Sequence, residues 1–242
     1  MIVVVPMAGK GSRYSEKGYN MPKPLIKVAG KPMFLWALKS LEDIEYEKLI
    51  FIALKQHEQQ YQISKSLNKY VEKSFELVLI DEVTEGQLCT VLKAKEFFKM
   101  DDDLLIIASD SFIKSKIGND IVNKDPYTKG IISVINLPGD KWSFAKVDKE
   151  GNVTEVAEKC RISDHASTGL YYFSNPGDFL SASDRIIQYK EKTKGEYYVI
   201  PVYQKLIEKK EKIKISIASE MWDMGTPEAK EIFENYLSKQ PY

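Results

Sequence analysis

Short runs of aliphatic and β-branched residues alternate with longer amphipathic stretches through the first half of the chain. The runs predict strands, and the stretches, in which apolar residues return every three or four positions, predict helices. The predicted strands are residues 2–5, 49–54, 75–80, 104–108 and 130–135, and the predicted helices are residues 33–41, 56–71 and 87–98. Strands and helices that alternate in this way predict a parallel-dominated sheet covered on both faces.

The second half of the chain is less regular and predicts an antiparallel addition to the sheet. The Gly-Asn pair at 151–152 predicts a turn between two strands, and the last helix begins at Pro227, a residue type that favours the first helical turn. The predicted strands are residues 143–147, 153–156, 169–173 and 213–218, and the predicted helices are residues 179–189, 199–209 and 227–237. No internal repeat or linker divides the sequence, so residues 1–242 are predicted to form a single α/β domain.

The charges of the chain cancel, with 35 basic and 35 acidic residues. A chain without net charge has no overall field that attracts nucleic acid or anionic lipid, so neither is an expected partner, and any phosphate site must be local. The first apolar run is too short for a signal peptide or a membrane span, which predicts a cytoplasmic protein. The sequence leaves open whether the chain forms a homo-oligomer.

A glycine-rich loop, Pro-Met-Ala-Gly-Lys-Gly-Ser-Arg at residues 6–13, directly follows the first predicted strand. Gly9 and Gly11 lack a Cβ atom, so their backbone can adopt positive φ and direct N–H groups at phosphate oxygens. Arg13 adds a planar fork of donors. Because open α/β sheets bind ligands at the carboxyl ends of their strands, this loop predicts a site for a nucleoside triphosphate.

A second cation, Lys23, lies ten residues after Arg13 and between two prolines. Its compact charge complements the arginine fork at a triphosphate. Pro22 and Pro24 fix φ on either side of it, which predicts that Lys23 lies in extended backbone rather than on a helix.

Two commoner phosphate-binding patterns do not fit the loop. A P-loop needs four residues between its first glycine and a Gly-Lys-Ser/Thr triplet, whereas Gly11 directly follows Lys10 here. A dinucleotide-binding Gly-x-Gly-x-x-Gly pattern starts at Gly9 but meets Tyr14 where a third small residue is needed. A Rossmann dehydrogenase is therefore disfavoured.

Five positions of this region, Gly9, Gly11, Arg13, Pro22 and Lys23, resemble the opening signature of the nucleotidyltransferase family, which includes nucleotide-sugar pyrophosphorylases and short cytidylyltransferases. The resemblance implies a Rossmann-like (GT-A-like) α/β fold, a three-layer sandwich around a mixed, mostly parallel sheet with a small antiparallel addition. It also implies an Mg²⁺-dependent enzyme of the EC 2.7.7 type. The implied nucleotide-binding residues are Met7, Ala8, Gly9, Gly11, Ser12, Arg13, Lys23, Gly86, Gln87 and Asp110.

Two acidic residues are candidate metal ligands. Asp110 follows the buried run 104–108, so its carboxylate is expected at the same sheet edge as the glycine loop, where it can hold a hard divalent ion. Taken alone, it fits an Asx turn or a helix cap equally well. The resemblance implies Asp223 as the second ligand of one Mg²⁺, although this residue also suits a cap of the final helix. Phe112 stands where a glycosyltransferase of related fold has the second aspartate of an Asp-x-Asp pair, which disfavours that alternative.

The acceptor contacts are implied by weaker resemblances in the second half. Glu158-Lys159 is similar to the family's Glu-Lys element, in which the lysine meets the phosphate of the incoming substrate and the glutamate its polar body. Thr168-Gly169 is similar to the opening of the family's next strand, whose first residue is more often asparagine. Glu196 is placed like a sugar-binding glutamate, although it also fits a favourable charge at the start of a helix.

Gly86 and Gln87 precede a predicted helix at the place where the family reads the base. Gly86 permits close backbone approach, and the Gln87 amide can pair with a base edge. The residues around them do not identify the base.

The resemblance implies a single in-line displacement, in which a substrate phosphate oxygen attacks the α-phosphorus of the NTP and pyrophosphate leaves. Arg13, Lys23, Lys159 and Asp110 are the implied catalytic residues. The leading reaction uses a sugar 1-phosphate and makes an activated sugar for bacterial capsule or lipopolysaccharide. A cytidylyltransferase that acts on a non-sugar phosphoester such as phosphocholine is the alternative within the family. A nucleotide-binding regulatory or scaffold protein without catalysis is the alternative from another class.

Overall fold

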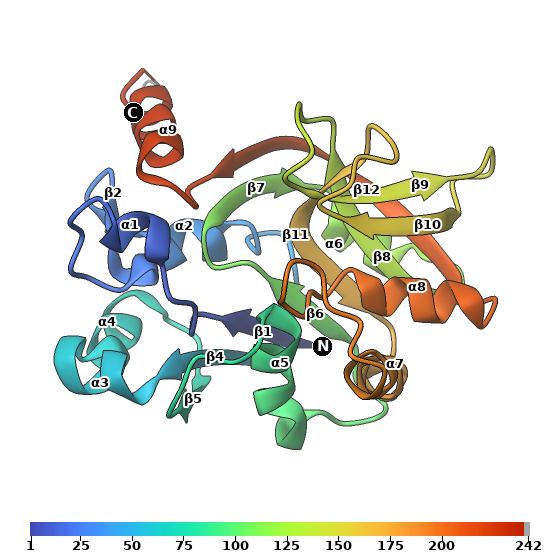
Figure 1. Ribbon diagram of the computed structural model, residues 1–242, viewed down its shortest axis with the longest axis horizontal. Helices are drawn as coiled ribbons and strands as arrows, with labels where there is room; N and C mark the ends of the chain where they lie inside the picture. The colour runs from blue at the N-terminus through green and yellow to red at the C-terminus, as the bar shows by residue number, and fades with distance from the viewer. Residues whose placement is uncertain (240–242) are drawn as a thin grey trace.

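The structure, a computed structural model, describes residues 1–239, in which ten strands form one mixed sheet (Figure 1). Eight of the strands run in the order β5-β4-β1-β6-β11-β8-β12-β7, and β9 and β10 attach beside β11. Their bounds are β1 (Ile2–Pro6), β4 (Lys48–Leu54), β5 (Phe75–Ile80), β6 (Leu104–Ile107), β7 (Ser111–Ser115), β8 (Thr128–Ile135), β9 (Ser143–Val147), β10 (Val153–Glu158), β11 (Ala166–Phe173) and β12 (Lys212–Asp223). A separate hairpin consists of β2 (Lys27–Val28) and β3 (Lys31–Pro32).

The N-terminal half of the sheet is parallel and the second half brings in antiparallel pairs. Strand β1 pairs in parallel with β4 and β6, and β4 pairs in parallel with β5. Strand β11 runs antiparallel to β6 and β8, and β9 and β10 form an antiparallel extension beside it. This arrangement confirms the predicted α/β class with a small antiparallel addition.

Helices cover both faces of the sheet because its central strands are apolar on both sides. In β1, Ile2 and Val4 face one cluster of buried side chains and Val3 and Val5 face the other. The first cluster includes residues of α5 (Gln87–Val91), α7 (Pro176–Gln188) and α8 (Pro201–Glu208). The second includes residues of α2 (Met33–Lys39), α4 (Ile63–Tyr70) and α6 (Ile117–Val122). The result is the three-layer sandwich that the sequence predicts.

A third apolar cluster joins the two ends of the chain. Helix α9 (Pro227–Leu237) lies beside α1 (Ser12–Ser15), as Figure 1 shows in red and blue. Phe233 of α9 and Tyr14 of α1 are buried in this cluster with Met224, which follows β12. The glycine loop and the end of β12 are therefore held next to each other.

Several elements differ from the sequence predictions. The predicted helix 56–71 is split into α3 (Lys55–Tyr61) and α4, because Gln62 has φ 49° and interrupts the helix. The predicted helix 87–98 continues from α5 as a 3₁₀ segment, Leu92–Phe97. Strand β7 and helix α6 were not predicted. Pairing with β7 extends β12 beyond the predicted end at residue 218 to Asp223.

None of the helices within residues 1–239 combines the length and the apolar content that crossing a bilayer requires.

Candidate active site

A cavity of about 660 Å³ opens at the carboxyl ends of β1 and β6 and collects residues from both halves of the chain. Its lining comes from the glycine loop, from residues 83–90 before and within α5, from residues 108–110 after β6, and from loops of the second half. The predicted site residues in this lining are Met7, Ala8, Gly9, Gly11, Ser12, Arg13, Lys23, Gly86, Gln87, Asp110, Glu158, Lys159 and Glu196.

A larger cavity of about 1220 Å³ lies elsewhere, around the end of α2, β7 and α6. Three of its lysines, Lys39, Lys114 and Lys116, are each paired with a carboxylate. None of the predicted site residues lines it. The smaller cavity, with its convergent charges, is the candidate active site.

The glycine loop turns into α1 at Gly11, which has φ 62°. A Cβ atom at Gly11 would lie 3.4 Å from Cβ of Lys23, so the loop and the Lys23 segment are closely packed. Gly9 does not have positive φ, and a Cβ atom there would have open space around it. The expectation of positive φ is therefore correct at Gly11 and wrong at Gly9.

Lys23 lies in a 3₁₀ turn, η1 (Lys23–Leu25), and not in the extended backbone that its flanking prolines predict. Pro24 sits in the first turn of η1, where its fixed φ and missing N–H are tolerated. The Lys23 ammonium donates to Asp110 Oδ2 at 2.6 Å, and both side chains are about three quarters buried. Burial raises the pKa of Asp110, but the charge and hydrogen bond of Lys23 outweigh it and hold the pKa below its ordinary value.

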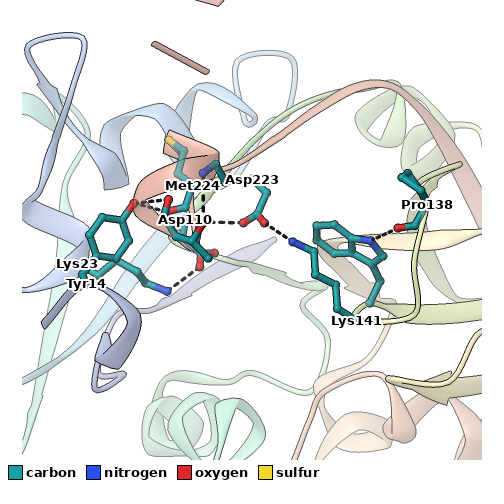
Figure 2. Close-up of polar contacts among 11 residues, drawn as sticks. Tyr14, Lys23, Asp110, Pro138, Lys141, Asp223 and Met224 are labelled. Atoms are coloured by element: carbon teal, nitrogen blue, oxygen red, sulfur yellow. Dashed lines mark hydrogen bonds and ion pairs between the residues drawn. The ribbon is translucent and has the colours of Figure 1, made fainter. Parts of the chain in front are cut away.

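The second carboxylate, Asp223, is the last residue of β12 and pairs in register with Ser111. Its Oδ1 accepts from the Gly225 N–H at 2.8 Å, and its Oδ2 accepts from the Lys141 ammonium at 3.1 Å. The backbone N–H of Met224 donates to the Asp110 carbonyl at 2.8 Å, which joins the two acidic segments (Figure 2).

The two carboxylates and an arginine converge on Gly225. A Cβ atom there would lie 2.9 Å from Asp223 Oδ1, 3.4 Å from Asp110 Oδ2 and 3.8 Å from an Arg13 nitrogen. Two carboxylates with room for water and phosphate oxygens fit Mg²⁺, which seldom takes an all-protein cage. Within residues 1–239, no third acidic, histidine or cysteine side chain joins them in a metal-binding group. The remaining ligands of an ion held there would be water and substrate.

Tyr14 connects the phosphate loop to the acidic segment. Its hydroxyl donates to the carbonyls of Met224 at 2.7 Å and Thr226 at 3.0 Å. Burial, reinforced by the charge of Asp110, raises the pKa of Tyr14 well above its ordinary value, so the hydroxyl remains a donor. From the sequence, Tyr14 argued only against a dinucleotide-binding loop. In the structure, its hydroxyl holds residues 224–226 against the glycine loop.

The loop expected to read the base is bound to the opposite loop of the cavity. Gly86 has φ 137°, and a Cβ atom there would lie 2.5 Å from the backbone nitrogen of Tyr197. Tyr197 donates to the Glu85 carbonyl at 2.8 Å, and the Leu88 N–H donates to the Tyr197 carbonyl at 3.1 Å. This contact leaves no space for any side chain at position 86.

The residues that the sequence analysis assigned to the acceptor are linked by side-chain contacts. The backbone of Lys159 has φ 53°, and its ammonium donates to the Tyr198 hydroxyl. That hydroxyl donates in turn to Glu196 Oε2 at 2.5 Å. Glu158 accepts from the Ser143 hydroxyl, and burial raises the pKa of this carboxyl above its ordinary value. A cation and two carboxylates are thus presented to the same end of the cavity.

Thr168 and Gly169 do not belong to the lining of the cavity. Thr168 is buried and its hydroxyl donates to the Ser133 carbonyl at 3.3 Å. Gly169 has φ 89° and packs against Ala108, whose N–H donates to the Gly169 carbonyl at 3.1 Å. Their place in the structure is behind Ala108, which does line the cavity.

Lys141 and Tyr198 are among the cavity residues that the sequence analysis did not assign to the site. Lys141 lies in a loop without a recognisable motif, and its contact with Asp223 joins positions 82 residues apart. Tyr198 stands two residues after Glu196, and only that proximity could have suggested it.

The family model described as "Nucleotidyl transferase" matches residues 2–238. The bifunctional protein GlmU of Methanocaldococcus jannaschii is 27% identical over 235 residues, which cover 94% of this chain and 52% of that protein. The low-salt glycan biosynthesis nucleotidyltransferase Agl11 of Haloferax volcanii is 26% identical over 231 residues, covering 93% of this chain and 62% of that protein. The chain thus spans between about half and two thirds of the length of these relatives.

One similar solved structure is the nucleoside-diphosphate-sugar pyrophosphorylase from Vibrio cholerae RC9. It is 28% identical, has a TM-score of 0.86 and covers 97% of this chain and 100% of its own. This similarity confirms the predicted GT-A-like fold. The family match over residues 2–238 and the shared fold lead to one conclusion, that the chain belongs to the nucleotidyl transferase family.

Proposed function

We propose that this protein transfers a nucleotidyl group from an NTP to the phosphate of a small-molecule acceptor and releases pyrophosphate. One observation carries the proposal: a single cavity joins the glycine loop, Arg13, Lys23, Asp110 and Lys159. Asp223 lies just outside its lining and converges with Asp110 on Gly225, which does line it. These are the charges that an in-line displacement between two phosphates needs.

On the nucleotide side, Arg13 and Lys23 bind the triphosphate and compensate the charge that develops on the leaving pyrophosphate. Asp110 and Asp223 hold Mg²⁺, and their convergence on Gly225 supports this role. When bound, the ion supplies positive charge to the phosphate oxygens. Gln87 pairs with the edge of the base, and Gly86, packed against the backbone of Tyr197, holds the loop that carries Gln87 in the cavity.

On the acceptor side, Lys159 binds and orients the attacking phosphate. Its hydrogen bond to Tyr198 supports this role, because it already restricts the Lys159 side chain. A restricted side chain loses less conformational entropy when it binds an anion. Glu158 and Glu196 bind the polar body of the acceptor. No residue of the protein needs to act as a nucleophile, so catalysis rests on position and charge.

The acceptor we propose is a sugar 1-phosphate, and the product an activated sugar for surface glycan assembly, with residues 1–242 acting as one catalytic domain. The name of the Haloferax volcanii relative, which refers to glycan biosynthesis, supports this assignment. Paired carboxylates at the acceptor end also suit a ligand rich in hydroxyl groups, because carboxylates accept hydrogen bonds.

Pyrophosphate release tests the proposal. The purified protein is incubated with Mg²⁺, each common NTP in turn, and a pool of sugar 1-phosphates and small phosphoesters. Release that needs one NTP and one acceptor supports the proposal and names both substrates. Release that needs CTP and a non-sugar phosphoester, in place of a sugar 1-phosphate, would identify the cytidylyltransferase alternative. Tight NTP binding without release from any acceptor would favour a regulatory protein. In a parallel reaction that offers a nucleotide sugar instead of an NTP, consumption of that sugar without pyrophosphate release would favour a glycosyltransferase.

A further inference from the structure

Lys141 is one of the four lysines that line the cavity, and it is paired with a carboxylate that the metal would need. Its ammonium lies 3.1 Å from Asp223 Oδ2, and Figure 2 shows it reaching Asp223 from the side opposite Lys23. The other aspartate, Asp110, is paired with Lys23. Each of the two converging carboxylates therefore has one lysine.

The two lysine–aspartate pairs differ in how firmly they are held. The Lys23 side chain is 24% exposed and lies 2.6 Å from its carboxylate, whereas the Lys141 side chain is 57% exposed and lies at the longer distance. An exposed ion pair contributes little to stability, since solvent screens it and its side chains keep alternative positions. Lys141 can therefore leave Asp223 at low cost when a divalent ion takes that oxygen.

The loop that carries Lys141 is itself well anchored. The Arg161 guanidinium donates to the carbonyls of Leu137 at 2.7 Å and Gly139 at 3.1 Å. At the other end of the loop, the Lys159 N–H donates to the Trp142 carbonyl at 2.9 Å. The base of Lys141 is thus fixed next to the residue proposed to bind the acceptor phosphate, while its ammonium is exposed.

Charge also favours a second cation at this position. The attacking phosphate is an anion that must approach a triphosphate, and repulsion between them is strong wherever water is excluded. Lys159 is the one cation that the sequence analysis assigned to the acceptor phosphate. Lys141 lines the same cavity and is joined through Trp142 to Lys159.

We propose that Lys141 binds the acceptor phosphate, and that it is held on Asp223 until a divalent ion displaces it. This inference rests on the proposed function and adds a residue to it. Lys141 compensates the charge of Asp223 before the metal binds, then supplies its own charge to the substrate once the metal is in place.

The test uses Lys141→Met, which removes the ammonium that lies 4.2 Å from the centre of the Trp142 ring and keeps an unbranched side chain of similar length. Lys141→Arg restores the charge. Lys146→Met is the matched control, because Lys146 is 56% exposed and pairs with Glu155 outside the cavity. Mn²⁺ binding to the substrate-free protein is followed by electron paramagnetic resonance, and the KM values for NTP and acceptor are measured by pyrophosphate release.

Two changes are expected in Lys141→Met. Its Mn²⁺ affinity rises at least about threefold because Asp223 has lost a competing cation, and its KM for the acceptor rises about tenfold, the order of one charge-assisted hydrogen bond. The KM for the NTP stays within about twofold of the wild type, and Lys141→Arg keeps a near-normal KM for the acceptor. Lys146→Met changes neither quantity.

Either change without the other overturns the proposal. Tighter Mn²⁺ binding with an unchanged acceptor KM would reduce Lys141 to a counter-ion of Asp223. A higher acceptor KM with unchanged Mn²⁺ binding would show that it does not compete for the metal site. Absence of pyrophosphate release from the wild type would instead refute the proposed function, and this inference with it.

Discussion

On the proposed nucleotide side of the cavity, the backbone conformation positions the charged and polar groups. On the proposed acceptor side, hydrogen bonds between side chains position them. Gly11, the η1 turn and Gly86 give the first side its shape through φ angles and close backbone contacts. Lys159, Tyr198 and Glu196 give the second side its shape through a chain of side-chain hydrogen bonds. Under the proposed function, backbone geometry positions the triphosphate that every NTP shares, while the side-chain contacts can be exchanged to suit different acceptors.

Lys23→Ala is expected to lower turnover most, because Lys23 is the residue proposed to bind the triphosphate that every NTP shares. Loss of one preorganised charge at the leaving group costs about 3 kcal/mol, so kcat should fall about a hundredfold or more for every acceptor. Steady-state pyrophosphate release measures it. Lys17→Ala is the control, because Lys17 pairs with Glu228 outside the cavity. Near-normal turnover in a folded Lys23→Ala protein would remove Lys23 from catalysis.

Asp110→Asn tests the carboxylates at the boundary between the two sides. The substitution keeps the shape of the side chain and removes its charge, so kcat should fall about a hundredfold, and added Mg²⁺ should restore little of it. Asp125→Asn is the matched control, because Asp125 pairs with Lys212 at 2.8 Å away from the cavity. An Asp110→Asn enzyme with wild-type Mg²⁺ dependence would contradict the assigned role.

Gly86→Ala should weaken the binding of both substrates, because Gly86 lies against the backbone of Tyr197 and so joins the two loops of the cavity. The added methyl group has no space, and positive φ adds strain of about 1–3 kcal/mol, so kcat/KM should fall about tenfold or more with raised KM values for both substrates. Gly18→Ala separates the two causes, since Gly18 has φ 84° but open space around it. An effect confined to the NTP would show that the two loops act independently.

Tyr198→Phe should have the smallest effect, and that effect should be confined to the acceptor. It removes the hydroxyl between Lys159 and Glu196, and a hydrogen bond to a charged group contributes about 1.5 kcal/mol or more, so the KM for the acceptor should rise about tenfold. The KM for the NTP should stay unchanged. Tyr189→Phe, at an exposed tyrosine, is the control. Equal changes in both KM values would mean that Tyr198 supports the whole cavity.

The nucleotide side could be predicted from the sequence because its groups are close together along the chain. Gly9, Gly11, Arg13 and Lys23 lie within fifteen residues of one another and directly follow an unambiguous buried strand. Even so, the backbone at Lys23 was predicted wrongly, because the 3₁₀ turn depends on a hydrogen bond from Ile26 as well as on proline. The place of these residues in one cavity was predicted correctly, and the backbone conformation only in part.

The acceptor side could be predicted only in part because its contacts join distant positions. Lys141 meets Asp223 across 82 residues, and Lys159 meets Tyr198 across 39. Strand β7 escaped prediction for the same reason, since its pairing with β12 creates it. Thr168 stands where the family more often has asparagine, and the structure places its hydroxyl against the Ser133 carbonyl.

The central claim is that the protein joins a nucleotide to a phosphorylated acceptor. Phosphorus NMR of a reaction with Mg²⁺, the active NTP and the acceptor follows every phosphorus atom at once. We expect the signals of the acceptor phosphate and of the NTP α-phosphate to be replaced by two mutually coupled signals of a new diphosphate, with one equivalent of pyrophosphate. Formation of nucleoside monophosphate or orthophosphate while the acceptor signal stays unchanged would contradict it.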